Sequence, residues 1–426
     1  MKVYLDTIGC RLNQSEIEMI AGQFRAAGHT VTGNPSEADL VVVNTCAVTA
    51  EAASDSRQKI RQSVRAGAGS VIATGCWSTL DPGGAAALPG VVRVVANDDK
   101  EHLVRDFLNL PEEVFDREPL ARQPLPGLHQ RTRAFIKVQD GCDNFCTFCI
   151  TKVARGASRS RTEAEVLHDI GAALQGGTQE IVLTGVQLGS WGRDFEQPLH
   201  LRHLVETILS KTSVSRLRLS SLEPWELDKA FFDLWQEPRI CRHLHLPLQA
   251  GADSTLRRMA RKTTPADYAR LLDMARRVSP DVAITTDILT GFPGESEADF
   301  TEGLAFIERM AFAGGHVFTF SARPGTPAAK YKNQVPGKVR KERSAVIRSV
   351  LAEAAERYAC RFTGQQLDVL WESSDSNGPH GWHFHGLSDN YLRVHAFSSE
   401  QLWNHICRVQ LDTWSPDGFE GHILAS

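Results

Sequence analysis

The sequence predicts a mixed α/β protein in three parts. These are an N-terminal doubly wound α/β domain, an open, partial barrel of six strand–helix units, and a small C-terminal antiparallel β-barrel. Three observations predict this class. Short apolar runs alternate with helical patterns over residues 1–96, a strand-then-helix pattern repeats six times over about 131–330, and short alternating strands follow Gly364. We place the domains at residues 1–115, 128–358 and 361–426.

In the first part, four apolar runs predict buried parallel strands: Lys2–Asp6, Leu40–Asn44, Val71–Thr74 and Val91–Val95. Between the first two, apolar residues fall at helical spacing from Ile17 to Phe24. Cys10, Cys46 and Cys76 lie at or shortly past the C-terminal ends of three of these strands. Ligands of open α/β sheets bind outside those ends, so three thiols distant in sequence could meet at one edge.

Residues 97–130 are charged and then proline-rich, which indicates a linker. The six strands of the second part centre on Phe135–Val138, Ile181–Leu183, Leu217–Leu219, Leu244–Leu246, Ala283–Ile288 and His316–Phe320. The helices between them include Glu163–Leu174, Leu201–Leu209 and Ala266–Val278. Six units fall short of the eight that close a barrel, so we expect an open one.

A basic helical stretch covers Lys338–Arg361, and short alternating strands follow it. We expect these strands at Gln366–Trp371, Tyr391–Ala396, Ile406–Leu411 and Gly418–Ile423. A small antiparallel barrel is a common nucleic-acid-binding shape. Its basic side chains are only Arg393 and Arg408, which makes it a poor phosphate binder. Ring stacking on RNA is the alternative, through Trp382, His383, His385 and Tyr391.

The bulk composition is globular, at 42% apolar and 23% charged residues over 426 positions. With no long apolar run and no leader-like N-terminus, we expect neither a membrane span nor secretion. Nine cysteines then indicate a reducing, cytoplasmic location and metal ligation, not disulfides. The net charge of −4 gives no global signal for nucleic acid, so an RNA partner needs local basic clusters. Three clusters are candidates: Arg131, Arg133, Lys137, Lys152, Arg155, Arg159 and Arg161; Arg257, Arg258, Arg261 and Lys262; and Lys338, Arg340, Lys341 and Arg343.

The compact cysteine triad Cys142, Cys146 and Cys149 has the spacing C-x3-C-x2-C. A zinc site usually has four ligands, often in pairs, and no partner pair is present. The triad, with Phe148 just before its last cysteine, resembles the radical S-adenosyl-L-methionine (SAM) superfamily. That resemblance implies a [4Fe-4S] cluster on these three catalytic cysteines. Its open iron binds SAM, and one electron cleaves SAM to a 5′-deoxyadenosyl radical.

Polar residues follow successive strands of the predicted partial barrel, at the face where barrel active sites are built. Together with the aromatic Phe148, they are our candidates for the SAM pocket: Thr184, Gly185, Ser221, Glu223, Gln249 and Asp287. Taken singly, each is more often a cap or a solvated polar group.

The segments TIGCRLNQSE, VVNTCAVT and ATGCW resemble the N-terminal domain of the methylthiotransferases. That family joins such a domain to a radical SAM barrel and a C-terminal TRAM barrel, in the order predicted above. The resemblance implies a second [4Fe-4S] cluster on Cys10, Cys46 and Cys76, which handles the sulfur, while a second SAM supplies the methyl group. Three buried thiols are the alternative interpretation of the dispersed triad.

The first cysteine motif, GCRLNQ, resembles the branch of this family that modifies N6-threonylcarbamoyladenosine in tRNA. The residues that discriminate branches are few: Arg11, Leu12, Asn13 and Gln14. The resemblance implies an anticodon loop as substrate, an electron donor such as flavodoxin or ferredoxin, and a sulfur source.

Other functions stay open at this point. They are methylthiolation of isopentenyladenosine or of a ribosomal-protein aspartate, a non-catalytic iron–sulfur RNA-binding redox sensor, and a radical SAM enzyme whose second cluster only relays electrons. Outside the motifs, we expect ordinary thiols at Cys241, Cys360 and Cys407. His243 and His245 share one strand face, and we expect them to line the barrel.

Overall fold

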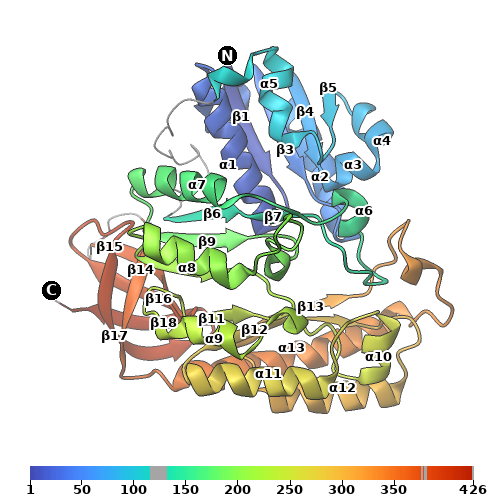
Figure 1. Ribbon diagram of the computed structural model, residues 1–426, viewed down its shortest axis with the longest axis vertical. Helices are drawn as coiled ribbons and strands as arrows, with labels where there is room; N and C mark the ends of the chain where they lie inside the picture. Colours follow the sequence, from blue (N-terminus) through green and yellow to red (C-terminus); the bar gives the residue numbers. More distant parts are fainter. Residues whose placement is uncertain (116–131, 376–377, 379–380, 425–426) are drawn as a thin grey trace.

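The computed structural model describes residues 1–115, 132–375, 378 and 381–424. Residues 116–130 of the expected linker and Arg131 lie outside the described residues. Residues 97–115 are not a linker, because they contain the helix α5 (Leu103–Leu108), whose Leu103 and Val104 are buried in the N-terminal core. Figure 1 shows the N-terminal domain at the top, the second part below it and the C-terminal barrel at the lower left. In the part of the chain that the structure describes, no helix has the length and apolarity needed to cross a membrane.

The N-terminal domain is a five-stranded parallel sheet in the order β2-β1-β3-β4-β5. Its strands are β1 (Lys2–Thr7), β2 (Thr30–Thr32), β3 (Leu40–Thr45), β4 (Ser70–Gly75) and β5 (Val91–Val95). Four of them confirm the expected strands. The additional edge strand β2 has only three residues, too few for a periodic pattern to register.

Helices cover both faces of this sheet, which confirms the doubly wound arrangement. They are α1 (Arg11–Ala26), α2 (Ala50–Arg65), α3 (Cys76–Leu80), α4 (Pro82–Ala86) and α5 (Leu103–Leu108). On one face, Ile17 and Phe24 of α1 pack with Val3 and Leu5 of β1. Residues of α2, α3 and α4 pack on the other face, against alternate side chains of β3 and β4.

The second part is an open arc of six parallel strands. They are β6 (Arg133–Lys137), β9 (Glu180–Thr184), β10 (Arg216–Leu219), β11 (His243–His245), β12 (Ala283–Thr290) and β13 (Gly314–Thr319). Ladders join β6-β9-β10 and β11-β12-β13, and isolated bridges such as Leu217 with Ile240 join the two halves. This confirms the partial barrel. The N-terminal domain packs on the first edge, where α1 lies against β6 and the N–H of Lys137 donates to Ser15 Oγ (3.0 Å).

Helices pack on the outer face of the arc. They are α7 (Glu163–Gln175), α8 (Leu201–Lys211), α9 (Lys229–Phe232), α11 (Pro265–Val278), α12 (Glu297–Met310) and α13 (Gly337–Cys360). Leu217 and Leu219 of β10 belong to the core shared with these helices. The short helix α10 (Asp253–Arg258) packs through Leu256 in a separate apolar cluster with Phe292 and Phe320. Because side chains alternate along a strand, Arg216 and Arg218 face the inner side of the arc. His243 and His245 do the same on β11, which confirms their expected barrel-lining position.

The C-terminal strands close into a barrel in the order β14-β15-β16-β18-β17. They are β14 (Gln366–Ser374), β15 (Trp382–Ser388), β16 (Arg393–Ser398), β17 (Ile406–Ser415) and β18 (Gly418–Ile423). Sequence periodicity predicted four of these. It missed β15, in which consecutive residues from Gly386 to Ser388 are buried, so the strand has no clean alternation. One neighbouring pair, β16 and β18, is parallel, and the other pairs are antiparallel.

The barrel docks on the inner side of the arc through the turn between β15 and β16. Tyr391 in that turn stacks on His243, with ring centroids 4.0 Å apart and planes 4° from parallel. Arg242 forms a two-pronged ion pair with Asp389 (2.6 and 2.9 Å). Arg218 donates to the Asp389 carbonyl (3.0 Å). The turn therefore closes part of the hollow that six strands leave open.

Candidate active site between two cysteine triads

The compact triad lies in a loop whose shape is held by a glycine and by hydrogen bonds. Gly141 starts this loop with φ of +68°, and a Cβ there would lie 1.8 Å from the Ala157 carbonyl oxygen, so only glycine fits. The Gln139 side chain donates to the carbonyls of Asp140 (2.7 Å) and Gly141 (2.8 Å). The N–H of Cys142 donates to the Gly156 carbonyl (3.1 Å).

The surroundings of these three sulfurs fit an iron–sulfur cluster. Burial, with smaller contributions from the neighbouring Cys149 and Cys146, raises the pKa of Cys142 to about 12. Such a thiol needs a metal to stay deprotonated. Donors also face the sulfurs, as is usual around iron–sulfur clusters. The N–H of Asn144 lies 3.4 Å from Cys142 Sγ, and the Arg261 guanidinium lies 3.8 Å from Cys146 Sγ.

The dispersed cysteines meet at one edge of the N-terminal sheet, as their strand-end positions predict. Cys10, Cys46 and Cys76 follow β1, β3 and β4, which are neighbours in the sheet. Gly9, with φ of +110°, lies so close that a Cβ on it would be 2.8 Å from Cys46 Sγ. Burial, with smaller contributions from Cys10 and Cys76, raises the pKa of Cys46 to about 11. Cys46 and Cys76 are buried and Cys10 is exposed, so the triad opens towards the surface on one side.

A buried ionic network ties the two triads together. Arg155, which is 2% exposed, donates to Glu16 (2.8 Å), Asp140 (2.9 Å) and Asn13 Oδ1 (2.8 Å). Asn13 Oδ1 also faces Cys10 Sγ (3.7 Å), and Asp140 lies two residues before Cys142. Although burial disfavours its charge, Arg155 and its other partners hold the pKa of Glu16 well below the usual range.

Two more contacts join the triads. Asn97 Nδ2 donates both to Cys76 Sγ (3.7 Å) and to the Ala154 carbonyl (2.7 Å), one residue before Arg155. Lys100 supports the network from the N-terminal side, because its Nζ lies 2.7 Å from Glu16 and 3.2 Å from Asn44. The relative position of the two triads is therefore fixed by the folded chain.

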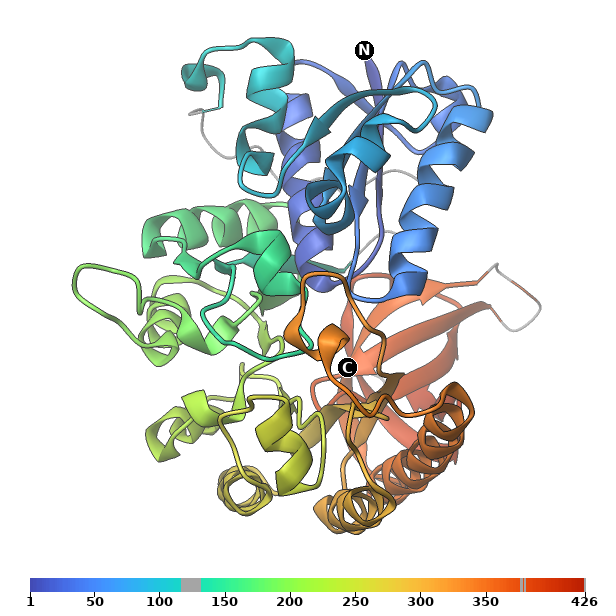
Figure 2. The ribbon, with the colours of Figure 1, turned by 90° about the vertical axis from the view of Figure 1, so that its right-hand side faces the viewer.

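The segment that follows β13 connects the triads from another side. Figure 2 shows it in orange, reaching from the arc towards the N-terminal domain. The N–H of Ala328 donates to the Thr147 carbonyl in the compact loop (2.9 Å). Arg323, in the same segment, lies close enough to Cys46 for their charges to interact, while burial lowers its pKa. This segment contains the string FSARPGTPA.

One of the predicted SAM-pocket residues, Glu223, lies beside the compact triad, and two others, Gln249 and Asp287, lie next to each other. Glu223 pairs with Arg261 (2.8 and 3.2 Å), the same guanidinium that lies beside Cys146. The N–H of Gln249 donates to the Asp287 carbonyl (2.8 Å), which places these two residues side by side. Asp287 Oδ2 lies 3.2 Å from His245 Nε2, and its Oδ1 is buried without a hydrogen bond in the structure.

The other four predicted pocket residues have identifiable packing roles. Phe148 packs edge-on against Phe292, with ring centroids 6.4 Å apart. Thr184 is buried at the end of β9, and Gly185 leaves room for Gln139, whose Oε1 a Cβ would approach to 2.9 Å. Ser221 forms a backbone bridge with His245. A contact between these four residues and SAM stays a prediction.

Sequence reasoning missed a buried carboxylate beside the compact triad. The Cys142 thiol donates to Gln187 Oε1 (3.1 Å), and Gln187 Nε2 donates to Glu226 Oε1 (2.5 Å). Burial raises the pKa of Glu226 to about 7. Gln187 lies in the string LTGVQLGSWG, but a lone glutamine or glutamate carries no spacing signal. For Arg261, the sequence predicts only membership of a basic cluster and not its position beside Cys146.

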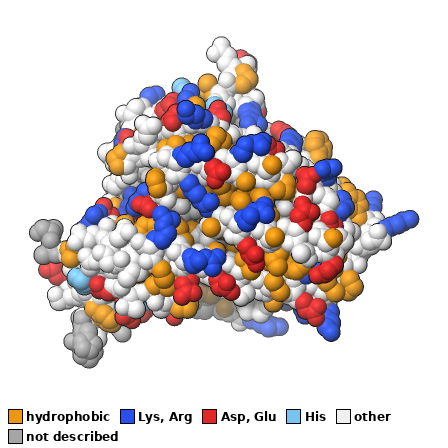
Figure 3. All heavy atoms as spheres, turned by 90° about the horizontal axis from the view of Figure 1, so that it is seen from below, with side chains coloured by type: hydrophobic (Ala, Val, Ile, Leu, Met, Phe, Trp, Pro, Cys, Tyr) orange, Lys and Arg blue, Asp and Glu red, His pale blue; other side chains and the backbone are white. Residues whose placement is uncertain are grey.

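Internal ion pairs reduce the predicted basic patches. Many of those side chains already pair with carboxylates of the chain, among them Arg155 with Glu16, Arg161 with Asp169 (2.6 Å), Lys137 with Glu101 (2.5 Å), Arg258 with Asp299 (3.0 Å), Arg261 with Glu223 (2.8 Å) and Arg343 with Glu295 (2.6 Å). Arg155, Lys137, Arg261 and Arg343 are at most 8% exposed at the side chain, so they offer little surface to a phosphate, and phosphate binding by the other basic residues stays a prediction. On the face seen in Figure 3, basic and acidic side chains are interspersed.

Comparisons with known proteins agree with this geometry. Residues 2–96 match the family described as uncharacterized protein family UPF0004, and residues 136–307 match the radical SAM superfamily. Among solved structures, the radical S-adenosylmethionine methyltransferase TsrM from Kitasatospora setae superposes with a TM-score of 0.58. It shares 14% identity and covers 83% of this chain and 89% of its own, which supports the fold.

Curated relatives cover nearly the whole chain. The threonylcarbamoyladenosine tRNA methylthiotransferase MtaB of Bacillus subtilis (strain 168) is 34% identical over 96% of this chain and 93% of its own. The protein of the same name from Thermotoga maritima is 37% identical over 87% of this chain and 86% of its own. The tRNA-2-methylthio-N(6)-dimethylallyladenosine synthase of Maricaulis maris is 28% identical over all of this chain and 98% of its own. The chain with these two joined thiol triads therefore belongs to the radical SAM methylthiotransferase family.

Proposed function

We propose that this enzyme inserts a methylthio group at carbon 2 of N6-threonylcarbamoyladenosine, the modified adenosine 3′ of the anticodon in tRNA. One observation carries the proposal: two separate thiol triads are held next to each other by the Arg155 network. The named relatives with 33–37% identity support this branch of the family. We further propose that residues 1–115, 128–358 and 361–426 act as the three functional units, in the cytoplasm.

The proposal assigns each triad its own cluster. Cys142, Cys146 and Cys149 would hold the [4Fe-4S] cluster that binds SAM, and Cys10, Cys46 and Cys76 would hold a second one. When bound, the clusters and SAM supply radical cleavage and sulfur transfer. The chain itself positions these groups: the Arg261–Glu223 pair lies beside Cys146, and Asp287 offers a carboxylate oxygen without a hydrogen-bond partner in the described structure.

An exposed aromatic ring lies within the compact cysteine loop. Phe145 is 74% exposed, and Lys152 Nζ lies 3.5 Å from its ring centroid. Val48, two residues after Cys46, is also exposed, at 53%. An aromatic face beside a cation suits an unstacked base and its phosphate, as in single-stranded loops of RNA. We propose that the target nucleotide approaches over Phe145.

The branch assignment gains support from the position of Arg11. Its guanidinium donates to Tyr391 Oη (2.8 Å), and Tyr391 stacks on His243 at the inner side of the arc. Arg11 belongs to the few residues that differ between branches of the family. A residue that follows Cys10 and reaches this hollow is well placed to contact the substituent on the adenosine.

The electron donor is proposed to be a small redox protein such as flavodoxin or ferredoxin, and a separate sulfur source replenishes the inserted atom. Each methylthio group requires an electron donor, because SAM cleavage consumes one electron, and a sulfur source, because one sulfur atom leaves with the product.

The experiment is mass spectrometry of nucleosides from total tRNA of a deletion strain. The 2-methylthio form of threonylcarbamoyladenosine should vanish on deletion and return with the wild-type gene. It should not return with Cys46→Ala or Cys142→Ala. Cys360→Ala is the matched control, since Cys360 is exposed and outside both triads, and it should restore the nucleoside. If the 2-methylthio form of threonylcarbamoyladenosine is unchanged after deletion, the assignment to the threonylcarbamoyladenosine branch is refuted. Loss of the 2-methylthio form of isopentenyladenosine instead would assign the enzyme to the isopentenyladenosine branch.

A further inference from the structure

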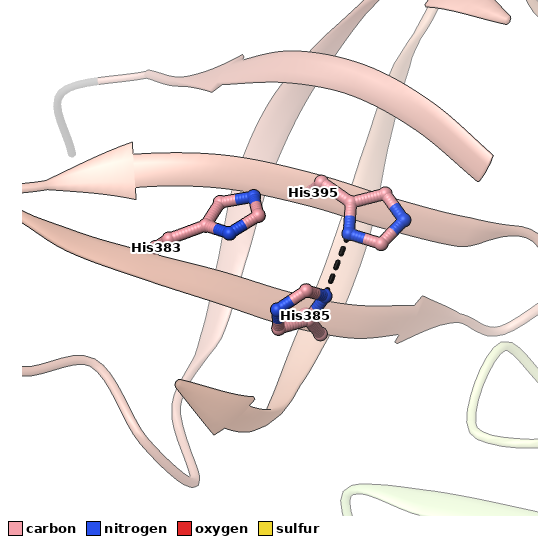
Figure 4. Close-up of side chains that lie close together, drawn as sticks. All are labelled: His383, His385 and His395. Carbon is pink, nitrogen blue, oxygen red and sulfur yellow. Dashed lines mark hydrogen bonds between the residues drawn. The ribbon is translucent and has the colours of Figure 1, made fainter. Parts of the chain in front are cut away.

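Three histidines converge on the outer face of the C-terminal barrel, away from both cysteine triads. His383 and His385 alternate on β15, and His395 lies directly opposite His385 on β16. Residues that alternate along a strand share a face, and directly paired residues lie side by side across strands. One ring nitrogen from each histidine lies within 4.8 Å of the others. Figure 4 shows the three rings grouped over the two strands.

The outer partners of two of these rings fix where their protons are. His385 Nε2 lies 2.9 Å from a carboxylate oxygen of Asp375, so this nitrogen carries the proton and donates it. His395 Nε2 lies 2.9 Å from the Asp417 carbonyl, which can only accept. In the neutral rings, both Nδ1 atoms therefore present lone pairs.

These two lone pairs point at each other. His385 Nδ1 and His395 Nδ1 are 2.7 Å apart, as the dashed line in Figure 4 marks. Two acceptors at that distance repel unless a positive species lies between or beside them. Only a shared proton or a metal cation meets this requirement.

The third ring favours the metal. His383 Nδ1 lies 3.4 Å from the same Asp375 carboxylate oxygen, which leaves its Nε2 as a further ligand. Phe397 stacks on the His383 ring, with centroids 4.6 Å apart and planes 20° from parallel, and so holds its orientation. A shared proton uses two nitrogens and gives the third no role.

We propose that His383, His385 and His395 bind one divalent transition metal ion, zinc by preference, with a water as fourth ligand. Imidazole nitrogens suit zinc and its neighbours and not magnesium or calcium. In histidine–zinc sites, the ring nitrogen that does not bind the metal donates to a carboxylate or a carbonyl. Asp375 and the Asp417 carbonyl are such acceptors for His385 and His395.

The structure needs only a small adjustment to accept the ion. With Zn–N distances of about 2.0–2.1 Å and tetrahedral angles, two ligand nitrogens lie about 3.3 Å apart. His385 and His395 must therefore open by roughly 0.6 Å, and His383, whose ligand nitrogen lies within 4.8 Å of theirs, must approach by up to about 1.5 Å. Rotations of three part-exposed rings provide such movements. The bound ion would join β15 to β16 and, through Asp375, to the segment just after β14.

The test measures zinc in the full chain with both triads already occupied by iron–sulfur clusters, so that no cysteine of either triad is free to compete. The protein is equilibrated anaerobically with buffered ZnCl2, and zinc and iron are measured by mass spectrometry. We expect one zinc per chain in the wild type and none in His385→Asn with His395→Asn, at equal iron content. His422→Asn is the matched control, since His422 also pairs with a carboxylate on this barrel (Asp412, 2.9 Å) but lies outside the three-histidine cluster, and it should keep the zinc.

X-ray absorption at the zinc edge of the wild type keeps the proposal testable if the double variant fails to fold. A first shell of nitrogen and oxygen only, with imidazole scattering, supports the site. A sulfur shell at about 2.3 Å would place the zinc on cysteines and overturn it. Equal zinc content in the wild type and the double variant would also overturn the proposal. A wild type that binds no zinc would overturn it too, and a shared proton would then explain the contact between His385 and His395.

Discussion

The buried guanidinium of Arg155 offers a sharp test of how the two triads are held together. We consider Arg155→Ala in the metal-free full chain. Glu16 and Asp140 would then lose the counter-charge that they share, although Lys100 stays 2.7 Å from Glu16. Removing one partner from a buried pair costs about 3–5 kcal/mol when nothing compensates the remaining charge. We expect about 3 kcal/mol, the lower end of that range, because Lys100 still compensates Glu16.

Arg159→Ala is the matched control. Arg159 lies four residues along and also pairs with the N-terminal domain, through Asp98 at 2.9 Å, but the two side chains are 48% and 68% exposed. An exposed pair contributes about 0–1 kcal/mol, so the two variants differ in burial and not in the kind of contact they remove.

The assay is urea unfolding followed by circular dichroism and by tryptophan fluorescence. The free energy of unfolding of the part that contains the interface should fall by about 3 kcal/mol in Arg155→Ala and by no more than about 1 kcal/mol in Arg159→Ala. Equal shifts for the two arginine variants would refute the claim that this network fixes the domains.

Three other predictions follow from single sites. Burial raises the pKa of Glu226 to about 7, so the folded chain holds a proton that the unfolded chain releases at lower pH, and stability falls as pH rises through this window. Relative to Glu226→Gln, the wild type should lose about 3 kcal/mol of unfolding free energy between about pH 4.5 and 7. A difference in unfolding free energy between the two proteins that does not change over this pH range would contradict the prediction. Gly141→Ala should abolish iron binding at the compact triad because its Cβ meets the Ala157 carbonyl. Gly28→Ala, where φ is +81° and the space is open, should leave the iron content unchanged. Phe145→Ala should weaken tRNA binding by about 1–3 kcal/mol in a filter-binding assay and leave the free energy of unfolding unchanged. Val92→Ala, at another exposed apolar side chain, should change neither tRNA binding nor stability.

Sequence periodicity predicted the elements that bury a regular face. The strands of the N-terminal sheet and of the arc are apolar runs bounded by turns, and both architectures were confirmed. Strand β15 escaped prediction because its seven residues include two histidines and a glycine and do not alternate in burial. Its position next to β16 became visible only in the structure, and with it the histidine cluster.

The cysteine motifs predicted which thiols would meet, because strand order alone brings β1, β3 and β4 together. The polar network between the triads could not be predicted in this way. Arg155 and Glu16 are 139 residues apart, and neither has a spacing that points to the other. Charge counting also could not show that Arg155, Lys137, Arg261 and Arg343 of the predicted basic clusters are buried in such internal pairs, because it does not distinguish a buried side chain from a solvated one.

The division of labour between the two triads is the central claim, and one assay tests it most directly. The reduced, cluster-loaded enzyme is incubated with SAM and unmethylthiolated tRNA, and 5′-deoxyadenosine and the methylthio nucleoside are measured together. Cys46→Ala should form 5′-deoxyadenosine within about twofold of the wild type and no methylthio nucleoside, whereas Cys142→Ala should form neither. If Cys46→Ala loses SAM cleavage as completely as Cys142→Ala, the dispersed triad serves electron transfer to the first cluster, and the proposed division of labour is contradicted.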